Sequence, residues 1–371
     1  MAFAGRAIYD TDVWASVAED VSAFISMISP VESPLLDALG DAMFPATNTL
    51  HEWLEEELTP DTIVSSATVS NTITYLPVHS GGVGVGKFLM VGTILKENTT
   101  GEYLQVTAVG VNTITVTRGF ASTTAATITA ADNLTVIAPA ALEGADVTVD
   151  VSRPRSRLSN YCQLFKKDII VSGTVQAVSN IGVANEFEHQ KQNRMRELVN
   201  DLEKAVILGK LSGNTLGSST AYRTMKGLWD FVTTNATSLG TLTTSALDDA
   251  IQAAWGNGAK DLDLLCCDAA FKRIVDGWNS SRVNVENRPD GYVNRVTEYT
   301  STFGTLPVIM SRWMPTNTCL VLSTQRVKVV PLSGRSFQFK GVSPTGDAEK
   351  GMVLGEYTLQ VMNEKGLAKI Y

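Results

Sequence analysis

The stretch from Gly81 to Lys87 has the spacing of a phosphate-binding loop. It reads Gly-Gly-Val-Gly-Val-Gly-Lys and satisfies G-x-x-x-x-G-K, in which backbone amides cradle phosphates and the lysine meets their charge. The next residue is Phe88, where a hydroxyl is needed to hold magnesium, and the sequence up to Leu95 is typical of a strand instead of the required helix. We therefore interpret the stretch as a glycine hinge, and a nucleotide-dependent enzyme remains only an alternative.

Glu186 and His189 stand three residues apart in a helical pattern, which resembles half of a di-iron carboxylate site. Such a site needs a second Glu-x-x-His pair and two further glutamates on facing helices. The chain has only two other histidines, His51 and His79, and neither belongs to a second pair. No G-x-S-x-G elbow is present for a nucleophilic serine. The sequence thus predicts a protein without a metal site, cofactor or catalytic residues, which is not an enzyme.

The cysteines lack the spacing of a zinc or redox site. None of them forms a C-x-x-C pair, and Cys266 and Cys267 end an apolar stretch that begins at Leu262, where core packing is favoured over redox chemistry. We expect reduced and mostly buried thiols at all four positions, which are Cys162, Cys266, Cys267 and Cys319.

Three arginines repeat every second residue, at Arg153, Arg155 and Arg157. In an extended strand this spacing directs all three guanidinium groups to one face. With Lys166 and Lys167 they place five positive charges between 151 and 167, a range without an acid. Two interpretations stay open: a solvated strand face, or a strip of ion pairs between subunits, because arginine favours bidentate pairing with carboxylates at interfaces.

An acidic stretch from His51 to Asp61 is the candidate partner of this strip on a neighbouring subunit. It carries five acids and no lysine or arginine. The residues that we single out as partners of the arginines are Glu55, Glu56 and Glu57.

Composition limits the class of protein. The chain of 371 residues exceeds the roughly 250–300 at which one hydrophobic core stops growing, so at least two compact regions are expected. The net charge of −8 disfavours a surface that grips nucleic acid, and any contact with DNA should be weak and non-specific. No secretory signal is recognisable, and no stretch approaches the ~18 apolar residues of a membrane helix. We therefore expect a protein made in a cytoplasm, without a membrane partner.

The pattern of elements changes along the chain. Residues 1–58 mix short helical patterns with breakers and resemble an arm, whereas residues 59–165 are rich in Thr, Val and Ile in short alternating runs. We expect a β excursion there, with a small β domain at about 86–140. Its clearest strands are predicted at 71–76, 103–108, 113–117 and 134–137, with a hairpin turn at 110–112.

A long helix is predicted over 182–208, with apolar positions three and four residues apart and Gly209 as a stop. Residues 226–330 alternate helical patterns, at 244–254 and 268–278, with strands at 262–265, 306–310 and 319–322. Strands predicted at 357–362 and 367–371 end the chain, and we expect them to join the region of the long helix.

This order of parts resembles the major capsid proteins of tailed phages, which have the Hong Kong 97-type fold. The stretches Tyr161–Ile170, Glu186–Gly209 and Met225–Leu228 resemble the spine-helix region of one capsid family, and 346–364 resembles its closing strands. The segment Thr113–Phe120 resembles small β inserts of phage virion proteins and departs from a minimal E-loop.

The resemblance implies an α+β fold with four parts: an N-terminal arm (1–58), an E-loop with a β insert (59–165), a P-domain (166–225 and 331–371) and an A-domain (226–330). It also implies self-assembly into hexamers and pentamers of an icosahedral head around double-stranded DNA. Scaffold, portal and decoration proteins are further implied partners, and the head would be assembled in the cytoplasm of a host bacterium.

Two other functions stay open on the sequence alone. The shell of a bacterial protein nanocompartment shares the fold and encloses enzymes. A surface-binding β protein would account for residues 62–148 but leaves the rest of the chain unused.

Overall fold

The computed structural model divides the chain into two compact units. We call Leu54–Leu158 the β unit, and the segments up to Trp53 and from Ser159 to Tyr371 together the body. Arg153 and most of the Gly81–Lys87 stretch lie outside the residues that the structure describes. Those residues are 32–40, 44–58, 60–80, 83–84, 88–146, 155–178, 183, 185–213, 217–239, 242–278, 283–285 and 296–371.

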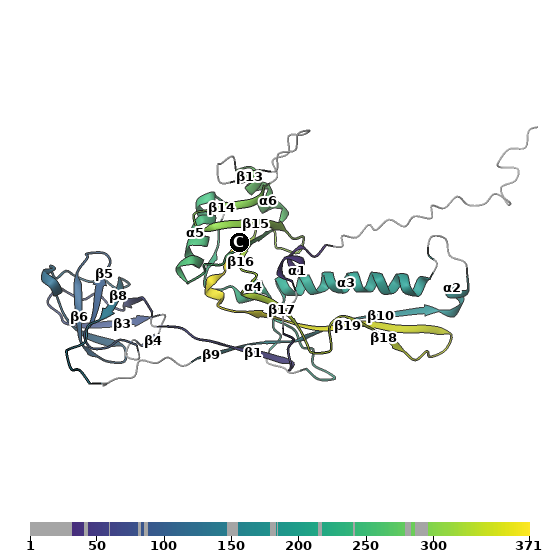
Figure 1. Cartoon of the computed structure of the whole chain (residues 1–371), viewed down its shortest axis with the longest axis horizontal. Helices are drawn as coiled ribbons and strands as arrows, with labels where there is room; N and C mark the ends of the chain where they lie inside the picture. Colours follow the sequence, from purple (N-terminus) through teal and green to yellow (C-terminus); the bar gives the residue numbers. More distant parts are fainter. Residues whose placement is uncertain are drawn as a thin grey trace, which may run out of the picture. The chain divides into compact units, whose positions relative to one another are not determined.

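The β unit is a small closed barrel (Figure 1). Its strands follow the order β2-β8-β5-β6-β7-β3-β4, and β2 also pairs with β3, which closes the sheet on itself. In the Thr93–Glu97 strand every second residue points inward and is buried, with Leu95 at the centre. The strands are β2 (Thr62–Ser65), β3 (Tyr75–Ser80), β4 (Val83–Gly84), β5 (Thr93–Glu97), β6 (Tyr103–Val109), β7 (Thr113–Thr117) and β8 (Asn133–Pro139).

Strands lie where the sequence predicts them at 103–108, 113–117 and 134–137, and the Gly110–Asn112 turn joins β6 to β7. The strand predicted over 71–76 is wrong in its position, because β3 begins only at Tyr75. Residues 70–73 form a turn instead, in which the Ile73 amide donates to the Ser70 carbonyl at 3.2 Å. Alternating Thr and Ile fit a strand, but the buried Arg118 side chain binds the carbonyls of this turn.

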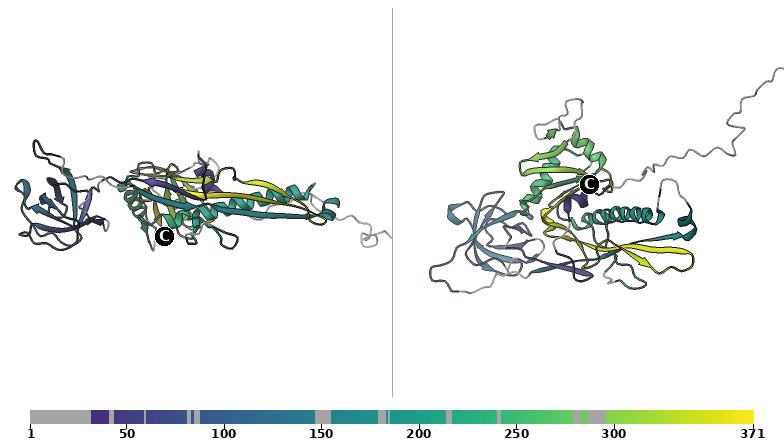
Figure 2. Two further views of the ribbon diagram at one scale, coloured as in Figure 1. Left: turned by 90° about the horizontal axis from the view of Figure 1, so that it is seen from below. Right: turned by 45° about the vertical axis from the view of Figure 1, so that its right-hand side comes forward.

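The first sheet of the body has four strands covered by a long helix. Strand β19 (Ala348–Val361) lies at its centre and pairs antiparallel with β10 (Gln163–Ser172), β17 (Val327–Pro331) and β18 (Gln338–Val342). Figures 1 and 2 show helix α3 (Glu186–Leu208) running beside this sheet. Its 23 residues span roughly 35 Å at about 1.5 Å per residue.

Helix α3 begins four residues later than predicted, at an N-cap. The Asn185 side chain accepts a hydrogen bond from the Glu188 amide at 3.2 Å and so satisfies one of the free amides of the first turn. The helix buries its apolar stripe against the sheet, with Leu198, Leu202 and Val206 almost fully covered. At its end Gly209 meets Gly227 so closely that a side chain at either position would collide with backbone.

The second sheet of the body has seven strands and two helices. Its order is β11-β20-β16-β12-β15-β14-β13, with β12 parallel to β15 and most other pairs antiparallel. Helix α6 (Ala269–Asp276) lies within the predicted range, and α5 (Thr244–Gly256) begins where predicted but ends two residues later. The strands are β11 (Ala236–Thr237), β12 (Leu264–Cys267), β13 (Val283–Val285), β14 (Val296–Ser301), β15 (Gly304–Met310), β16 (Cys319–Leu322) and β20 (Ala368–Ile370).

The last strand departs from expectation. Strand β19 joins the sheet under α3 as predicted, but β20 pairs with β16 and β11 in the seven-stranded sheet. The chain turns between them at Asn363, which has a positive φ of 49°, and at a short 3-10 helix over Glu364–Gly366. Ala368 and Ile370 are then buried in the core of the second sheet, which accounts for the departure.

All four cysteines are free and buried, as predicted. Burial raises the pKa of the Cys162 thiol to about 11 and that of Cys267 to about 12, so these thiols stay protonated and unreactive at neutral pH. The body also has three short helices: α1 (Pro34–Leu39), α2 (Gly173–Ala177) and α4 (Leu228–Phe231). Among the described helices none is long and apolar enough to cross a membrane.

Candidate intersubunit surface

A two-stranded ribbon carries the chain between the body and the β unit. Strand β1 (Leu50–Glu55) pairs with β9 (Ser156–Tyr161). The Cys162 amide donates to the Thr49 carbonyl at 2.8 Å, and the Ser156 hydroxyl donates to the Glu55 carbonyl at 3.2 Å. The two strands are therefore antiparallel, which brings the arginine strip and the acidic stretch beside one another in one chain.

Arg155 lies opposite Glu56 in this ribbon. Their side chains are 3.4 Å apart and 64% and 57% exposed, so water screens the pair, which should stabilise the chain by less than about 1 kcal/mol. The alternation of a strand places Arg157 on the same face as Arg155, whereas Glu55 points to the other face. Glu57 follows the end of β1. The predicted acidic partners are thus not all on the arginine face.

Asn160 fixes the base of the ribbon on the body. Its side chain is buried and donates to the carbonyls of Lys226 at 3.0 Å and Leu359 at 2.8 Å. Its oxygen accepts from the amides of Tyr161 at 2.9 Å and Lys226 at 2.8 Å. The sequence gives no signal for this role, because the partners of Asn160 lie 66 and 199 residues away.

The sheet face opposite α3 holds a shallow groove of about 510 Å³. Side chains of directly opposite residues in antiparallel strands share a face, so Lys166 and Leu354 both line it, with Lys340 from β18. The groove therefore combines an apolar floor with cations at its rim. Its lining residues are Leu164, Lys166, Arg335, Gln338, Phe339, Lys340, Met352 and Leu354.

A buried carboxylate lies beside this groove, on the same face of β19 as Leu354. Glu356 of β19 lies 2.8 Å from the Arg223 guanidinium and 2.6 Å from that of Arg335. Arg223 also donates to the Cys162 carbonyl, so it ties the loop after α3 to the end of the ribbon. Lys166 is paired with Asp168 at 3.1 Å on the exposed surface. Lys340, the third cation at the rim, is exposed as well.

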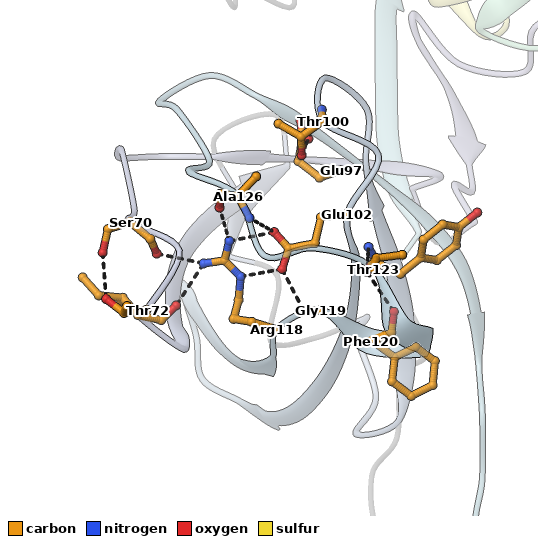
Figure 3. Close-up of polar contacts among 12 residues, drawn as sticks. Ser70, Thr72, Glu97, Thr100, Glu102, Arg118, Gly119, Phe120, Thr123 and Ala126 are labelled. Carbon is orange, nitrogen blue, oxygen red and sulfur yellow. Dashed lines mark hydrogen bonds and ion pairs between the residues drawn. The ribbon is translucent and has the colours of Figure 1, made fainter.

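The β unit contains a buried ion pair that the sequence pattern did not predict (Figure 3). Glu102 and Arg118 meet at 2.7 Å with side chains 0% and 6% exposed. Glu102 also accepts from the amides of Gly119 at 2.9 Å and Ala126 at 3.0 Å. Arg118 donates to the carbonyls of Ser70 and Ile73 at 2.9 and 3.1 Å. The pair ties three loops together, and Arg118 directly follows strand β7.

Glu186 and His189, the two residues that resemble half of a di-iron site, contact other side chains of their own helix. Glu186 accepts a hydrogen bond from Gln190 at 2.6 Å, and His189 lies 3.1 Å from Asn193. Over the described ranges no group of three or more His, Cys, Asp or Glu side chains has the arrangement of a metal site. These contacts suit a solvated helix face.

Comparison with known proteins agrees with this architecture. A chain from Gordonia phage Cozz has a TM-score of 0.53 at 10% identity, covering 100% of this chain and 96% of that one. A chain from Microbacterium phage Oxtober96 gives 0.52 at 12% identity, with 98% and 99% covered. At such low identity these two show a shared α+β fold alone.

Further comparisons complete the picture. The SrpI encapsulin complex of Synechococcus elongatus PCC 7942 gives a TM-score of 0.41 at 12% identity, over 58% of this chain and 75% of that one. No curated protein sequence matches the chain significantly. The family model described as SU10 major capsid protein, in contrast, matches residues 6–371. The chain therefore belongs to the SU10 family of phage major capsid proteins.

Proposed function

We propose that this subunit of the phage head shell forms hexamers and pentamers of an icosahedral capsid around double-stranded DNA. In this proposal residues 1–58 are the N-terminal arm, 59–165 the E-loop with its β insert, 166–225 and 331–371 the P-domain, and 226–330 the A-domain. Scaffold, portal and decoration proteins are the further partners, and assembly takes place in the host cytoplasm. The acidic net charge of −8 suits an inner wall that contacts DNA only weakly.

The observation that carries the proposal is the exposed apolar and charged surface of the ribbon. Leu54 and Leu58 are 62% and 86% exposed on either side of three glutamates. Exposed apolar groups rimmed by charge are typical of protein interfaces. We infer that this segment contacts a neighbouring subunit, and that Arg153, Arg155 and Arg157 are further interface residues.

The groove on the body is complementary in charge and apolar character to this acidic segment. Its cations, Lys166, Arg335 and Lys340, match the charge of Glu55, Glu56 and Glu57, and its apolar floor suits the two leucines. Complementary charge across an interface steers encounter and fixes its register. We propose this groove of a second copy as the surface that receives the acidic segment.

Cysteine crosslinking between two separately made variants tests this contact. Glu56→Cys chains mixed with Lys340→Cys chains before assembly should crosslink with a short bismaleimide, because all four native cysteines are buried. The control replaces Lys340→Cys by Lys260→Cys, which is equally exposed but lies away from the groove. If Lys340→Cys and Lys260→Cys chains give crosslinked heterodimers in equal yield while shells form normally, the proposed contact is contradicted. The proposal that the chain assembles into shells would then still stand.

A further inference from the structure

The groove occupies only part of the sheet face opposite α3 (Figure 1). Rows of directly opposite residues cross β10, β19 and β18 on this open face, and successive rows are two residues or about 6.6 Å apart along each strand. The first row contains Lys166, Leu354 and Gln338, the second Asp168, Met352 and Lys340, and the third Ile170, Lys350 and Val342. The groove includes residues of the first two rows and none of the third, which therefore extends the open face beyond it.

The third row presents apolar surface although a lysine lies at its centre. Ile170 and Val342 flank Lys350 and are 66% and 39% exposed. The Lys350 amine donates a hydrogen bond to the Thr345 hydroxyl in the connection between β18 and β19, beyond the end of the row. Its charge is thereby held away from the row, and its hydrocarbon stem lies between the two apolar side chains.

The acidic segment (54–58) presents apolar and charged groups in alternation. Leu54, Glu56 and Leu58 share a face when the chain is extended, because successive side chains of a strand point to opposite sides. The two leucines, which are 62% and 86% exposed, are then four residues or about 13 Å apart. Glu56 lies beside Arg155 of its own chain, and a carboxylate has enough lone pairs to accept from a second donor as well.

The spacing on the open face is the same. Leu354 on the groove floor and Lys350 in the third row are also four residues apart on β19, so the two apolar positions are separated by about 13 Å. The exposed Lys340 belongs to the row between them. An apolar, a cationic and a second apolar position on the sheet thus match an apolar, an anionic and a second apolar position of the segment.

We propose that the acidic segment of one subunit binds the open face of a second copy in a single register. Each leucine covers one apolar position, and the glutamate between them pairs with the cation between those positions. The contacts are Leu54 with Leu354, Glu56 with Lys340, and Leu58 with Ile170 and Val342. This register rests on the proposed contact between segment and groove, and it adds the third row as a surface of its own.

A shifted register is unfavourable. A slip of the segment by two residues towards the groove would leave the third row uncovered and place the Glu56 carboxylate over the apolar Leu354. A charged group on an apolar surface loses water without gaining a partner, whereas the proposed register gives both leucines an apolar contact and the carboxylate a cation.

Charges at the two ends of the open face favour the proposed direction of the segment over the reverse one. Glu52 lies two residues before Leu54 on the same face of β1. In the proposed direction it lies beside Arg335, at the groove end of the open face. In the reverse direction it would lie beyond the third row, beside Asp347 and Glu349, where like charges repel.

Disulfide formation between cysteines in separate chains tests the register, because the bond requires Cβ atoms within roughly 4.5 Å of one another. Leu58→Cys chains are mixed with Val342→Cys chains before assembly and oxidised with copper phenanthroline, while all four native cysteines stay buried. The matched control pairs Leu58→Cys with Gln338→Cys, which is also exposed but lies two rows or about 13 Å away. The first pair should give about tenfold more heterodimeric disulfide than the control.

The other outcomes separate the register from the contact as a whole. More disulfide with Gln338→Cys than with Val342→Cys would show the reverse direction and overturn the proposal. Equal yields would overturn it too, and if Glu56→Cys still crosslinks to Lys340→Cys, the proposed contact of segment and groove survives. Failure of that central pair as well would overturn both.

Replacing the outer leucine tests the third row in an independent way. Leu58→Ser should raise the protein concentration needed for half-maximal assembly by about tenfold or more, since the side chain no longer gains from leaving water. The control Leu142→Ser changes a leucine of the same unit that is 85% exposed and lies outside the segment, and it should assemble as the wild type does. Folding of both variants is checked by circular dichroism. Unchanged assembly of Leu58→Ser, or equal losses in the two variants, would overturn the proposal.

Discussion

Replacing Arg118 by methionine is expected to destabilise the β unit by about 3–5 kcal/mol, because it leaves the Glu102 carboxylate buried without its partner. Small domains have only about 5–15 kcal/mol of stability, so the substitution removes a large share of it. The loss would spread beyond the pair, since Arg118 also binds the carbonyls of the turn at 70–73. Urea denaturation, with hydrogen exchange of the β5 and β6 peptides to assign the transition, measures the effect.

The matched control is Arg155→Met, which removes an arginine from an exposed ion pair in the same unit and should cost less than about 1 kcal/mol. Burial opposes ionisation of Glu102, but hydrogen bonds from Arg118, Ala126 and Gly119 outweigh it and lower its pKa. The pair therefore stabilises the wild type above the usual glutamate pKa, and this stability is lost as pH falls. Equal effects of the two substitutions would contradict the structural role of the buried pair.

Reversing the charges of Arg153, Arg155 and Arg157 to glutamate is expected to prevent assembly of shells. The described two lie on one face of the ribbon, and glutamates in place of the arginines would repel the carboxylates of a neighbouring subunit with which the strip is proposed to pair. Folding should be retained, because exposed ion pairs contribute little stability. Sedimentation velocity measures assembly, and circular dichroism measures folding of the same sample.

Two controls distinguish an effect of the arginine positions from an effect of net charge and from loss of the Arg155–Glu56 pair within one chain. Reversal of three exposed cations elsewhere, Arg196, Lys210 and Lys260, changes the net charge equally and should leave assembly intact. Exchanging the paired charges in Arg155→Glu with Glu56→Arg preserves the contact within the chain. If the triple reversal assembles normally, the strip is only a solvated face, as the alternative interpretation holds.

Local periodicity was enough to predict the elements whose apolar faces are regular. Helix α3 shows an apolar position every three or four residues, and β6 and β7 alternate strictly, so each pattern reports which face is buried. The same alternation misplaced β3, because Thr72 and Ile73 belong to a turn whose carbonyls are bound by a side chain 45 residues away. Periodicity contains no information about such a partner.

The polar residues that fix the architecture were missed for the same reason. Asn160 and Glu356 act through partners that are close only in the folded chain. The buried Glu203 did leave a signal, since it directly follows Leu202 on the buried stripe of α3, and an acid at the border of an apolar stripe is unusual. The arginine spacing predicted a common face for Arg155 and Arg157, but it gave no indication that Glu56 of the same chain lies opposite.

Negative-stain electron microscopy of the chain expressed alone, beside analytical ultracentrifugation of the same fraction, tests the central claim most directly. Membership of the capsid family and the exposed surfaces of the ribbon predict closed shells or hexamer rings. A chain that stays monomeric at every concentration, even when it is expressed with the scaffold protein of its phage, would contradict the account.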